Sequence, residues 1–328
     1  MKLRRKIFWP VWLLLLARCS QAAQLTESFT TDPLANGWRI FGDTNLFQWD
    51  AANQNLAVTW DSAQSNSFFY HPLGTILTKA DDFGFSFELQ LADITNGLTT
   101  GQPYTFELAA GFINLAAATG TNYQRGIVVA GAGARNLCEF DYFPDSGYGA
   151  TISPTMISTN SAYSQFATVF AYPLEIDPGA LFTVAMDYTA SNQTLRTTMT
   201  RNGEAFGPIP DVVLGAGFQD FRLDQFAISS YSAAGADGSL LAHGVVDNLV
   251  VTVPPPPVQN LTGSFTNNFW QASFLSRSNW LYTLERTTDF QTWTNVSPAV
   301  SGGATNLQLT DANPLGGRAF YRVKGARP

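Results

Sequence analysis

The sequence of 328 residues carries a formal net charge of −7, and this charge is unevenly distributed. Residues 25–253 contain 22 acidic and 7 basic side chains, whereas residues 258–328 contain 3 acidic and 6 basic ones. The acidic main region argues against nucleic acid and anionic membranes as partners, because both require a basic surface on the protein. An acidic region is compatible with solubility and with the binding of hard cations.

The N-terminal segment has the pattern of a secretory signal. Four basic residues in positions 1–6 precede an apolar run over 7–16, which is too short to cross a bilayer as a helix of about 20 residues. Ser20 and Ala22 then supply the small-x-small pattern of a cleavage site. We therefore predict a signal peptide over residues 1–22 and a secreted, periplasmic or cell-surface location. No membrane insertion is expected after cleavage, the alternative being an uncleaved anchor.

The cysteine content bears on stability and chemistry. Cys19 and Cys138 are the two cysteines, and Cys19 would leave with the signal peptide. Cys138 then has no partner for an intramolecular disulfide. Because Cys138 falls in a strand pattern, we expect a buried, inert thiol there rather than a nucleophile.

Alternation of apolar and polar residues with a period of two predicts strands through residues 24–253. The pattern is clearest over 83–91 and recurs over 182–188. Asn202-Gly203 predicts a type I′ hairpin turn after a threonine-rich strand. We find no amphipathic helix pattern in the mature chain. Short strands, turn residues and 13% aromatic residues are typical of an all-β sandwich.

An uninterrupted proline run over 254–257 predicts a linker, since proline lacks an amide donor and cannot continue a strand ladder. The remaining residues, 258–328, contain further strand-like runs such as 280–285 and 319–323. This region is loosely similar to fibronectin type III strands and to small C-terminal β modules of secreted bacterial proteins. We expect a small β-sandwich-like domain that acts as a spacer or surface-attachment module.

The most informative motif lies in residues 137–147. On a strand, Glu139 and Asp141 would share one face, with their Cα atoms about 6–7 Å apart. Pro144 would end the regular pairing, and Asp145 would then lie in the following loop. Oxygen ligands grouped in this way suit a hard cation. The alternative is an acidic strand face exposed to solvent.

The spacing of this motif resembles the metal and sugar site of legume-type (L-type) lectins. That resemblance implies that Glu139 binds a transition metal, that Asp141 bridges two metals, and that Phe143 and Asp145 bind calcium. It also implies that Phe143 and Asp145 contact the sugar. Tyr142 and Tyr148 would supply further aromatic faces for a glycan.

The resemblance extends in chain order over much of residues 25–253. It includes a Tyr-x-x-Pro-Leu-like segment at 69–73, a Phe-rich strand at 85–87, a hairpin strand at 182–190 and a late segment at 227–235. It implies a concanavalin A-like jelly-roll sandwich.

Two departures from the family pattern limit what the resemblance implies. Residues 146–153 contain neither the Asp nor the His that completes both metal sites, which leaves at most a single calcium. Gln102-Pro103 stands where the family places the Asp of its sugar-binding loop, so the main charge-assisted acceptor for sugar hydroxyls is missing.

The resulting expectation is a secreted, lectin-like protein that binds a polysaccharide or glycan with the help of calcium. One alternative is a non-catalytic structural or surface-attachment module. An exposed aromatic residue beside the acidic loop would favour the lectin over this module.

A second alternative is a glycoside hydrolase of the β-glucanase type. Glu139 would be its nucleophile, Asp141 its helper, and the loop residue Asp145 a displaced acid. The position that should hold the acid/base falls on Phe143 or Pro144, neither of which transfers protons. We therefore lean against catalysis.

A second acidic pair and the two histidines are further candidate site residues. Glu27 and Asp247 could pair across the first and last strands around a second calcium, as in many jelly-roll carbohydrate-binding modules. The alternative for them is a capped strand end. His71 and His243, the two histidines, are expected to be packing or turn residues, because neither lies in a nucleophile-elbow context.

Overall fold

The computed structural model describes residues 23–96, 108–121, 123–125, 133–160, 162, 165–232 and 240–328. Within these residues the chain is almost entirely β-strand, as predicted. Helices are limited to α1 (Leu115–Ala118) and two short 3-10 turns at Pro33–Asn36 and Thr44–Leu46. None of these helices is long enough to cross a membrane. The predicted signal peptide and Gln102-Pro103 lie outside the described residues.

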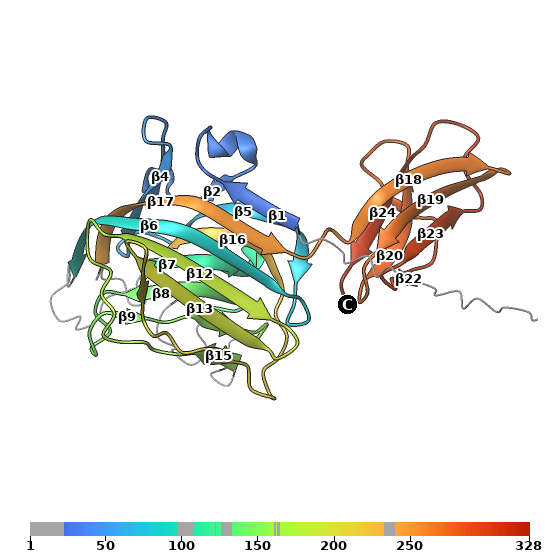
Figure 1. Ribbon diagram of the computed structural model, residues 1–328. Coiled ribbons are helices and arrows are strands. Elements are labelled where there is room, and N and C mark those ends of the chain that lie inside the picture. Colours follow the sequence, from blue (N-terminus) through green and yellow to red (C-terminus); the bar gives the residue numbers. More distant parts are fainter. Residues whose placement is uncertain are drawn as a thin grey trace, which may run out of the picture.

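Two antiparallel sheets form a large sandwich from residues 23–253 (Figure 1). The first sheet has nine strands in the order β14-β13-β12-β6-β17-β4-β3, with β1 added to β17 and β15 to β13. Its strands are β1 (Ala23–Glu27), β3 (Phe47–Asp50), β4 (Asn55–Asp61), β6 (Phe83–Asn96), β12 (Leu181–Thr189), β13 (Thr194–Arg201), β14 (Glu204–Phe206), β15 (Val212–Val213) and β17 (Leu240–Val253).

The second sheet of the large sandwich carries the motif identified from the sequence. It has eight strands in the order β11-β10-β8-β7-β16-β5-β2, with β9 added to β8. Its strands are β2 (Arg39–Phe41), β5 (Ser67–Leu77), β7 (Leu108–Ile113), β8 (Leu137–Phe143), β9 (Thr151–Ile152), β10 (Thr155–Ile157), β11 (Phe166–Thr168) and β16 (Leu223–Ser230).

The core between these sheets follows from the period-two pattern. Phe83, Phe85 and Phe87 on β6 all point inward, and the ring of Phe85 packs edge-on against Phe112 and Phe226 of the opposite sheet. Burial of so many aromatic side chains, at about 25 cal/mol per Å² of apolar surface, accounts for a large sandwich without a disulfide. The all-β jelly-roll sandwich expected from the sequence is confirmed.

The hairpin turn predicted at Asn202-Gly203 joins β13 to β14. Both residues have positive φ, 50° and 86°, as a type I′ turn requires. The threonine-rich strand before the turn spans Thr194–Arg201, as expected.

A smaller, C-terminal sandwich is built from residues 258–326 and has a core of its own. One sheet has three strands in the order β18-β19-β23, and the other has β21-β20-β22 with β24 added to β20. The strands are β18 (Val258–Thr266), β19 (Phe269–Ser276), β20 (Leu281–Thr287), β21 (Thr294–Asn295), β22 (Val300–Ser301), β23 (Asn306–Asp311) and β24 (Phe320–Ala326). The proline run lies between β17 and β18.

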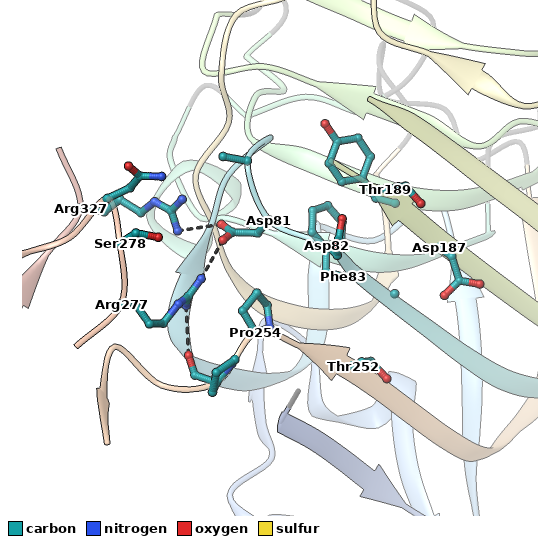
Figure 2. A pocket seen from close by; sticks show the side chains of 15 residues that line it. Asp81, Asp82, Phe83, Asp187, Thr189, Thr252, Pro254, Arg277, Ser278 and Arg327 are labelled. Carbon is teal, nitrogen blue, oxygen red and sulfur yellow. Dashed lines mark hydrogen bonds and ion pairs between the residues drawn. The ribbon is translucent and has the colours of Figure 1, made fainter. Parts of the chain in front are cut away.

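The junction between the two sandwiches is held by a buried cluster of charges (Figure 2). The Asp81 carboxylate accepts hydrogen bonds from the guanidinium groups of Arg277 and Arg327, each at 2.7 Å. Ile76 of β5 packs against the core of the C-terminal sandwich beside this cluster. A cleft of about 600 Å³ opens next to the cluster, with Asp187 on its opposite wall.

Candidate functional site

Strand β8 lies inside the second sheet, where it pairs with β7 on one side and with β9 and β10 on the other. Cys138, Phe140 and Tyr142 belong to the hydrophobic core, so Glu139 and Asp141 face the other side of the sheet. This is the alternation predicted from the sequence. All seven residues of the strand are buried, however, including both acids. The alternative interpretation, an acidic strand face exposed to solvent, is therefore wrong for this strand.

A single arginine covers the two carboxylates. The Nε of Arg125 lies 2.5 Å from Oε1 of Glu139, and its Nη2 lies 2.5 Å from Oδ2 of Asp141. Arg125 is 2% exposed, and both acids are 0% exposed. One guanidinium thus engages two carboxylates away from water, where charge-assisted hydrogen bonds are strong. The sequence analysis did not identify Arg125. Two signals pointed to such a residue: a buried acidic pair needs a cation, and Arg125 is one of seven basic residues in an acidic region.

A tyrosine completes the surroundings of Glu139. The hydroxyl of Tyr231, just after β16, donates to Oε2 of Glu139 at 2.9 Å. Burial, followed by the nearby charge of Glu139, raises the pKa of Tyr231 well above its usual value, so the residue stays a donor. The hydroxyl of Tyr123 lies 3.4 Å from that of Tyr231. Both oxygens of Glu139 therefore have a protein donor.

Gly111 on β7 leaves the space in which Glu139 sits. A Cβ atom at Gly111 would lie 2.4 Å from the carbonyl oxygen of Cys138 and 2.6 Å from Cβ of Glu139. Both distances are impossible for a real side chain. The close approach of β7 and β8 at the acidic pair therefore requires glycine.

The residues around Glu139 and Asp141 do not fit a calcium ion. Calcium takes six to eight oxygen ligands, whereas the cation in contact with these two carboxylates is Arg125. Across the described residues, no group of three or more His, Cys, Asp or Glu side chains is placed to hold a metal. Asp145 lies in the loop after β8, where its Oδ1 accepts a hydrogen bond from the backbone of Gly147 at 2.8 Å. The structure thus brings Glu139 and Asp141 together and places Asp145 in a separate turn.

Two of the aromatic residues expected at a sugar site are buried. Tyr142 belongs to the core, and its hydroxyl accepts a hydrogen bond from the backbone N–H of Ile176 at 3.1 Å. Burial raises the pKa of Tyr142 to about 12. Phe143 is also buried. Neither ring offers a face to a glycan.

Tyr148 is the expected aromatic residue that does face solvent. Its side chain is 74% exposed and stacks on Tyr172, which is 51% exposed, with ring centroids 5.4 Å apart and planes at 28°. Phe170, two residues before Tyr172, is also exposed. Tyr172 is not recognisable from local sequence, because the isolated bridge between Ile152 and Ala171 brings it to Tyr148.

The loop that carries Tyr148 is fixed by its own hydrogen bonds. The Ser146 hydroxyl lies 2.7 Å from the Thr151 hydroxyl, and the backbone N–H of Ser146 donates to the Gly149 carbonyl at 3.2 Å. Gly147 and Gly149 both have positive φ, which glycine adopts without strain. The segment before Ile176 is tied to this loop, since the N–H of Leu174 donates to the Ala150 carbonyl at 2.8 Å. The two tyrosines therefore belong to one ordered surface.

The second pair of acids considered from the sequence does not meet. Glu27 pairs in register with the buried Leu249 and points inward, where its carboxylate accepts from the indole N–H of Trp38 at 3.1 Å. Asp247 pairs in register with Glu88, outside the core. The two carboxylates lie on opposite faces of the same sheet, and no calcium site between them is formed.

The histidines and the cysteine occupy structural positions. The ring nitrogens of His71 lie 2.8 Å and 3.3 Å from backbone oxygens of Pro72 and Asn36. His243 Nδ1 lies 2.8 Å from Oδ1 of Asp93. Cys138 is completely buried, and burial raises the pKa of its thiol well above its usual value.

Comparison with known proteins bears on the fold. No protein-family model and no curated protein matches the sequence. Among solved structures, peanut lectin with a nine-residue peptide aligns with 70% of this chain and 98% of its own, at 15% identity and a TM-score of 0.41. A legume lectin-like domain from Entamoeba histolytica aligns with 69% of this chain and 94% of its own, at 10% identity and a TM-score of 0.41. Winged bean acidic lectin with methyl-α-D-galactose aligns with 72% of this chain and 100% of its own, at 10% identity and a TM-score of 0.41.

All three are lectins or lectin-like domains, the class of protein that the sequence resembles. The two-sheet architecture itself confirms the β-sandwich that the resemblance to L-type lectins implied. Identities of 10–15% transfer neither a ligand nor a metal site.

Proposed function

We propose that this protein binds carbohydrate through the exposed surface formed by Tyr148 and Tyr172. The observation that carries the proposal is the stacked, solvent-exposed pair of rings directly beside the loop that follows β8. An exposed aromatic residue at this point is the feature expected to separate a lectin from a structural module.

The physical basis is the match between an aromatic face and the apolar C–H face of a sugar ring. Tyrosine combines a large apolar ring with a polar hydroxyl and loses little side-chain entropy on binding. The ordered loop around Ser146 and Gly149 holds the rings in place before a ligand arrives, which lowers the cost of binding.

Two acidic residues lie close in sequence to the tyrosines of the aromatic surface. Glu175, three residues beyond Tyr172, is exposed, and Asp145 lies three residues before Tyr148. Carboxylates accept strong, charge-assisted hydrogen bonds from hydroxyl groups. A neutral, hydroxyl-rich glycan suits this composition better than an acidic one.

The proposed binding does not depend on calcium held by Glu139 and Asp141. The guanidinium of Arg125 pairs with both residues, and both are fully buried. The same burial keeps Glu139 from a substrate, which disfavours the glycosidase alternative. We infer binding without catalysis.

The test is a screen of the purified protein on an array of neutral glycans, followed by titration calorimetry with the best ligand. We expect binding that persists in chelator and that Tyr148→Ala and Tyr172→Ala each weaken by about tenfold or more, as is usual for aromatic anchors.

Phe41→Ala is the matched control. Phe41 is exposed on β2, at the other edge of the same sheet, so its removal should leave affinity unchanged. Binding that survives loss of both tyrosines would contradict the proposed surface. Absence of any glycan ligand would leave a structural or surface-attachment module as the better explanation.

We further propose that the protein acts outside the cytoplasm after removal of residues 1–22. Its support is the basic, apolar and small-residue order of this segment. Intact mass measurement of the exported protein should give a chain that begins at or next to Ala23. A full-length mass in the exported fraction would contradict cleavage.

A further inference from the structure

The C-terminal sandwich carries a cluster of aromatic and cationic side chains on its outer face. Phe290 lies 4.0 Å from Phe320 and 6.5 Å from Trp293, measured between ring centroids. The guanidinium of Arg322 lies 4.0 Å from the Trp293 ring centroid, and that of Arg318 lies 5.1 Å from the Phe320 ring centroid. We call these five residues the 290–322 cluster.

The 290–322 cluster is not part of the core of its domain. That core is formed by six other residues: Ala272, Phe274, Trp280, Tyr282, Leu284 and Leu309. Phe290 is 60% exposed, and both arginines of the cluster are exposed. Interior packing therefore does not explain why three aromatic rings are gathered here.

Phe290 also adopts a backbone conformation that bulky residues avoid. Its φ is +60°, in the left-handed region. Seven of the twelve non-glycine residues with positive φ in the described part of the chain are asparagines. The other phenylalanine among the twelve, Phe29, is completely buried, so packing compensates its strain. Phe290 has no such burial, and strain of this kind is concentrated at functional sites.

The loop around Phe290 is built to hold this conformation. The Asp289 carboxylate accepts hydrogen bonds from the backbone N–H groups of Gln291 and Thr292 at 2.9 Å and 2.8 Å. The Thr287 hydroxyl accepts from the N–H of Phe290 at 3.0 Å. The backbone N–H groups of the loop, chiefly that of Thr292, lower the pKa of Asp289 to about 2. The loop thus presents an ordered phenylalanine to solvent.

The charge around the cluster is positive. The domain has three acidic residues, of which Glu285 pairs with Arg322 and Lys324, and Asp311 pairs with Arg286. The third, Asp289, directs its carboxylate at the loop backbone. Within the described chain, Arg318 forms no ion pair. The guanidinium of Arg318 is therefore available to pair with an anionic group of a binding partner.

We propose that the 290–322 cluster binds an anionic polysaccharide. The rings of Phe290 and Trp293 would pack against sugar rings, while Arg318 would pair with a carboxylate or sulfate group. Arginine suits this role because its planar guanidinium pairs with both kinds of anion. This site is independent of the one proposed at Tyr148 and Tyr172.

The test is affinity electrophoresis of the full chain in gels that contain polygalacturonate, dextran sulfate or neutral dextran. We expect retardation by at least one anionic polymer, despite the net charge of −7, and loss of retardation at high salt. The polymer that retards more strongly identifies carboxylate or sulfate as the recognised group.

Phe290→Asn and Arg318→Gln should each weaken retardation about tenfold, which corresponds to 1.4 kcal/mol. Asparagine favours positive φ, so we expect Phe290→Asn to unfold at the same temperature as the parent chain or higher. A residue kept for stability alone would not behave in this way. Phe265→Thr, which removes another exposed phenylalanine from the same domain, is the matched control and should bind normally.

Three results would overturn the proposal. Equal retardation by neutral dextran would contradict recognition of an anion, and full retardation of both variants would place the site elsewhere. Failure of both anionic polymers to retard the parent chain would also overturn it. Tyr148→Ala should leave retardation intact, so a failure here is distinguishable from failure of the site on the large sandwich.

Discussion

Two buried charge clusters of opposite composition hold different parts of this molecule. On the outer face of β8, Arg125 forms ion pairs with two acids, Glu139 and Asp141. At the junction between the two sandwiches, Asp81 forms ion pairs with two arginines, Arg277 and Arg327. The first cluster carries a net charge of −1 and the second a net charge of +1.

The two clusters differ in whether their charged side chains can reach water once the ion pairs separate. The acids of β8 lie on a central strand and cannot reach water without unfolding the sheet. Arg277 and Arg327 belong to a separate sandwich, which can move away and return them to solvent. Ion pairs between arginine and carboxylate thus stabilise the fold of the large sandwich at β8 and the contact between the two sandwiches at Asp81.

The largest expected effect comes from Arg125→Met, which leaves two buried carboxylates without their cation. Breaking a buried ion pair costs about 3–5 kcal/mol, and we expect a loss of at least this size in the free energy of unfolding by urea. The triple variant with Glu139→Gln and Asp141→Asn should recover most of that loss. If Arg125→Met alone were neutral, the guanidinium would not be the required partner.

A second prediction concerns Tyr142, on the core face of the same strand. Its pKa is raised to about 12 in the folded protein, against an unfolded value of 10.0. The resulting stability is fully present below pH 10 and is lost as pH rises towards 12. The loss should reach about 2 kcal/mol at about pH 11.5.

Denaturation of the parent and Tyr142→Phe at several alkaline pH values measures this contribution. The variant should lose less stability between pH 9 and pH 11.5, by about 2 kcal/mol. Identical pH profiles would show that Tyr142 ionises as readily in the folded chain as in the unfolded one.

Asp81→Asn is expected to have a smaller effect than Arg125→Met. The two arginines it releases can regain water, so we expect a loss of about 1–2 kcal/mol in the stability of the junction. Calorimetry should then show two separate transitions, and X-ray scattering a larger maximum dimension. Asp187→Asn, in the same cleft but outside the cluster, is the control and should change neither. A single unchanged transition in Asp81→Asn would contradict a clamp at this position.

The smallest effect is expected from calcium. A metal that binds only the folded state at a hundredfold excess over its Kd adds about 2.7 kcal/mol, but Arg125 already supplies the cation. We therefore expect no shift in the unfolding temperature between millimolar calcium and chelator. A calcium-dependent rise that Asp141→Asn removes would restore the expected metal site.

Local sequence patterns were sufficient for the strands and for the face of each residue on β8. The alternation in residues 83–91 predicted the inward phenylalanines of β6, and Asn202-Gly203 predicted the β13–β14 hairpin, because both depend on neighbouring residues. The same alternation predicted that Glu139 and Asp141 share one face of β8, as they do in the structure.

The partners of these residues were not predictable, because long-range folding supplies them. Arg125 reaches β8 from a loop, and Tyr172 reaches Tyr148 through the pairing of Ile152 with Ala171. The local sequence of a carboxylate motif does not show whether the cation that pairs with it is a metal ion or a guanidinium. The positive φ of Phe290 has no local sequence signal either, since asparagine or glycine is the usual residue for that conformation.

The two clusters also differ in when they can form. Arg125 lies 14 residues from Glu139, whereas Arg327 lies 246 residues after Asp81. The last strand of the large sandwich, β17, ends at Val253, so 74 residues remain to be made before Arg327, which takes a ribosome roughly 4–15 s at about 5–20 residues per second. The large sandwich can therefore complete its own core while Asp81 still faces water. Docking of the C-terminal sandwich is then the last step of assembly. It buries the Asp81 carboxylate, which has been hydrated since early in synthesis.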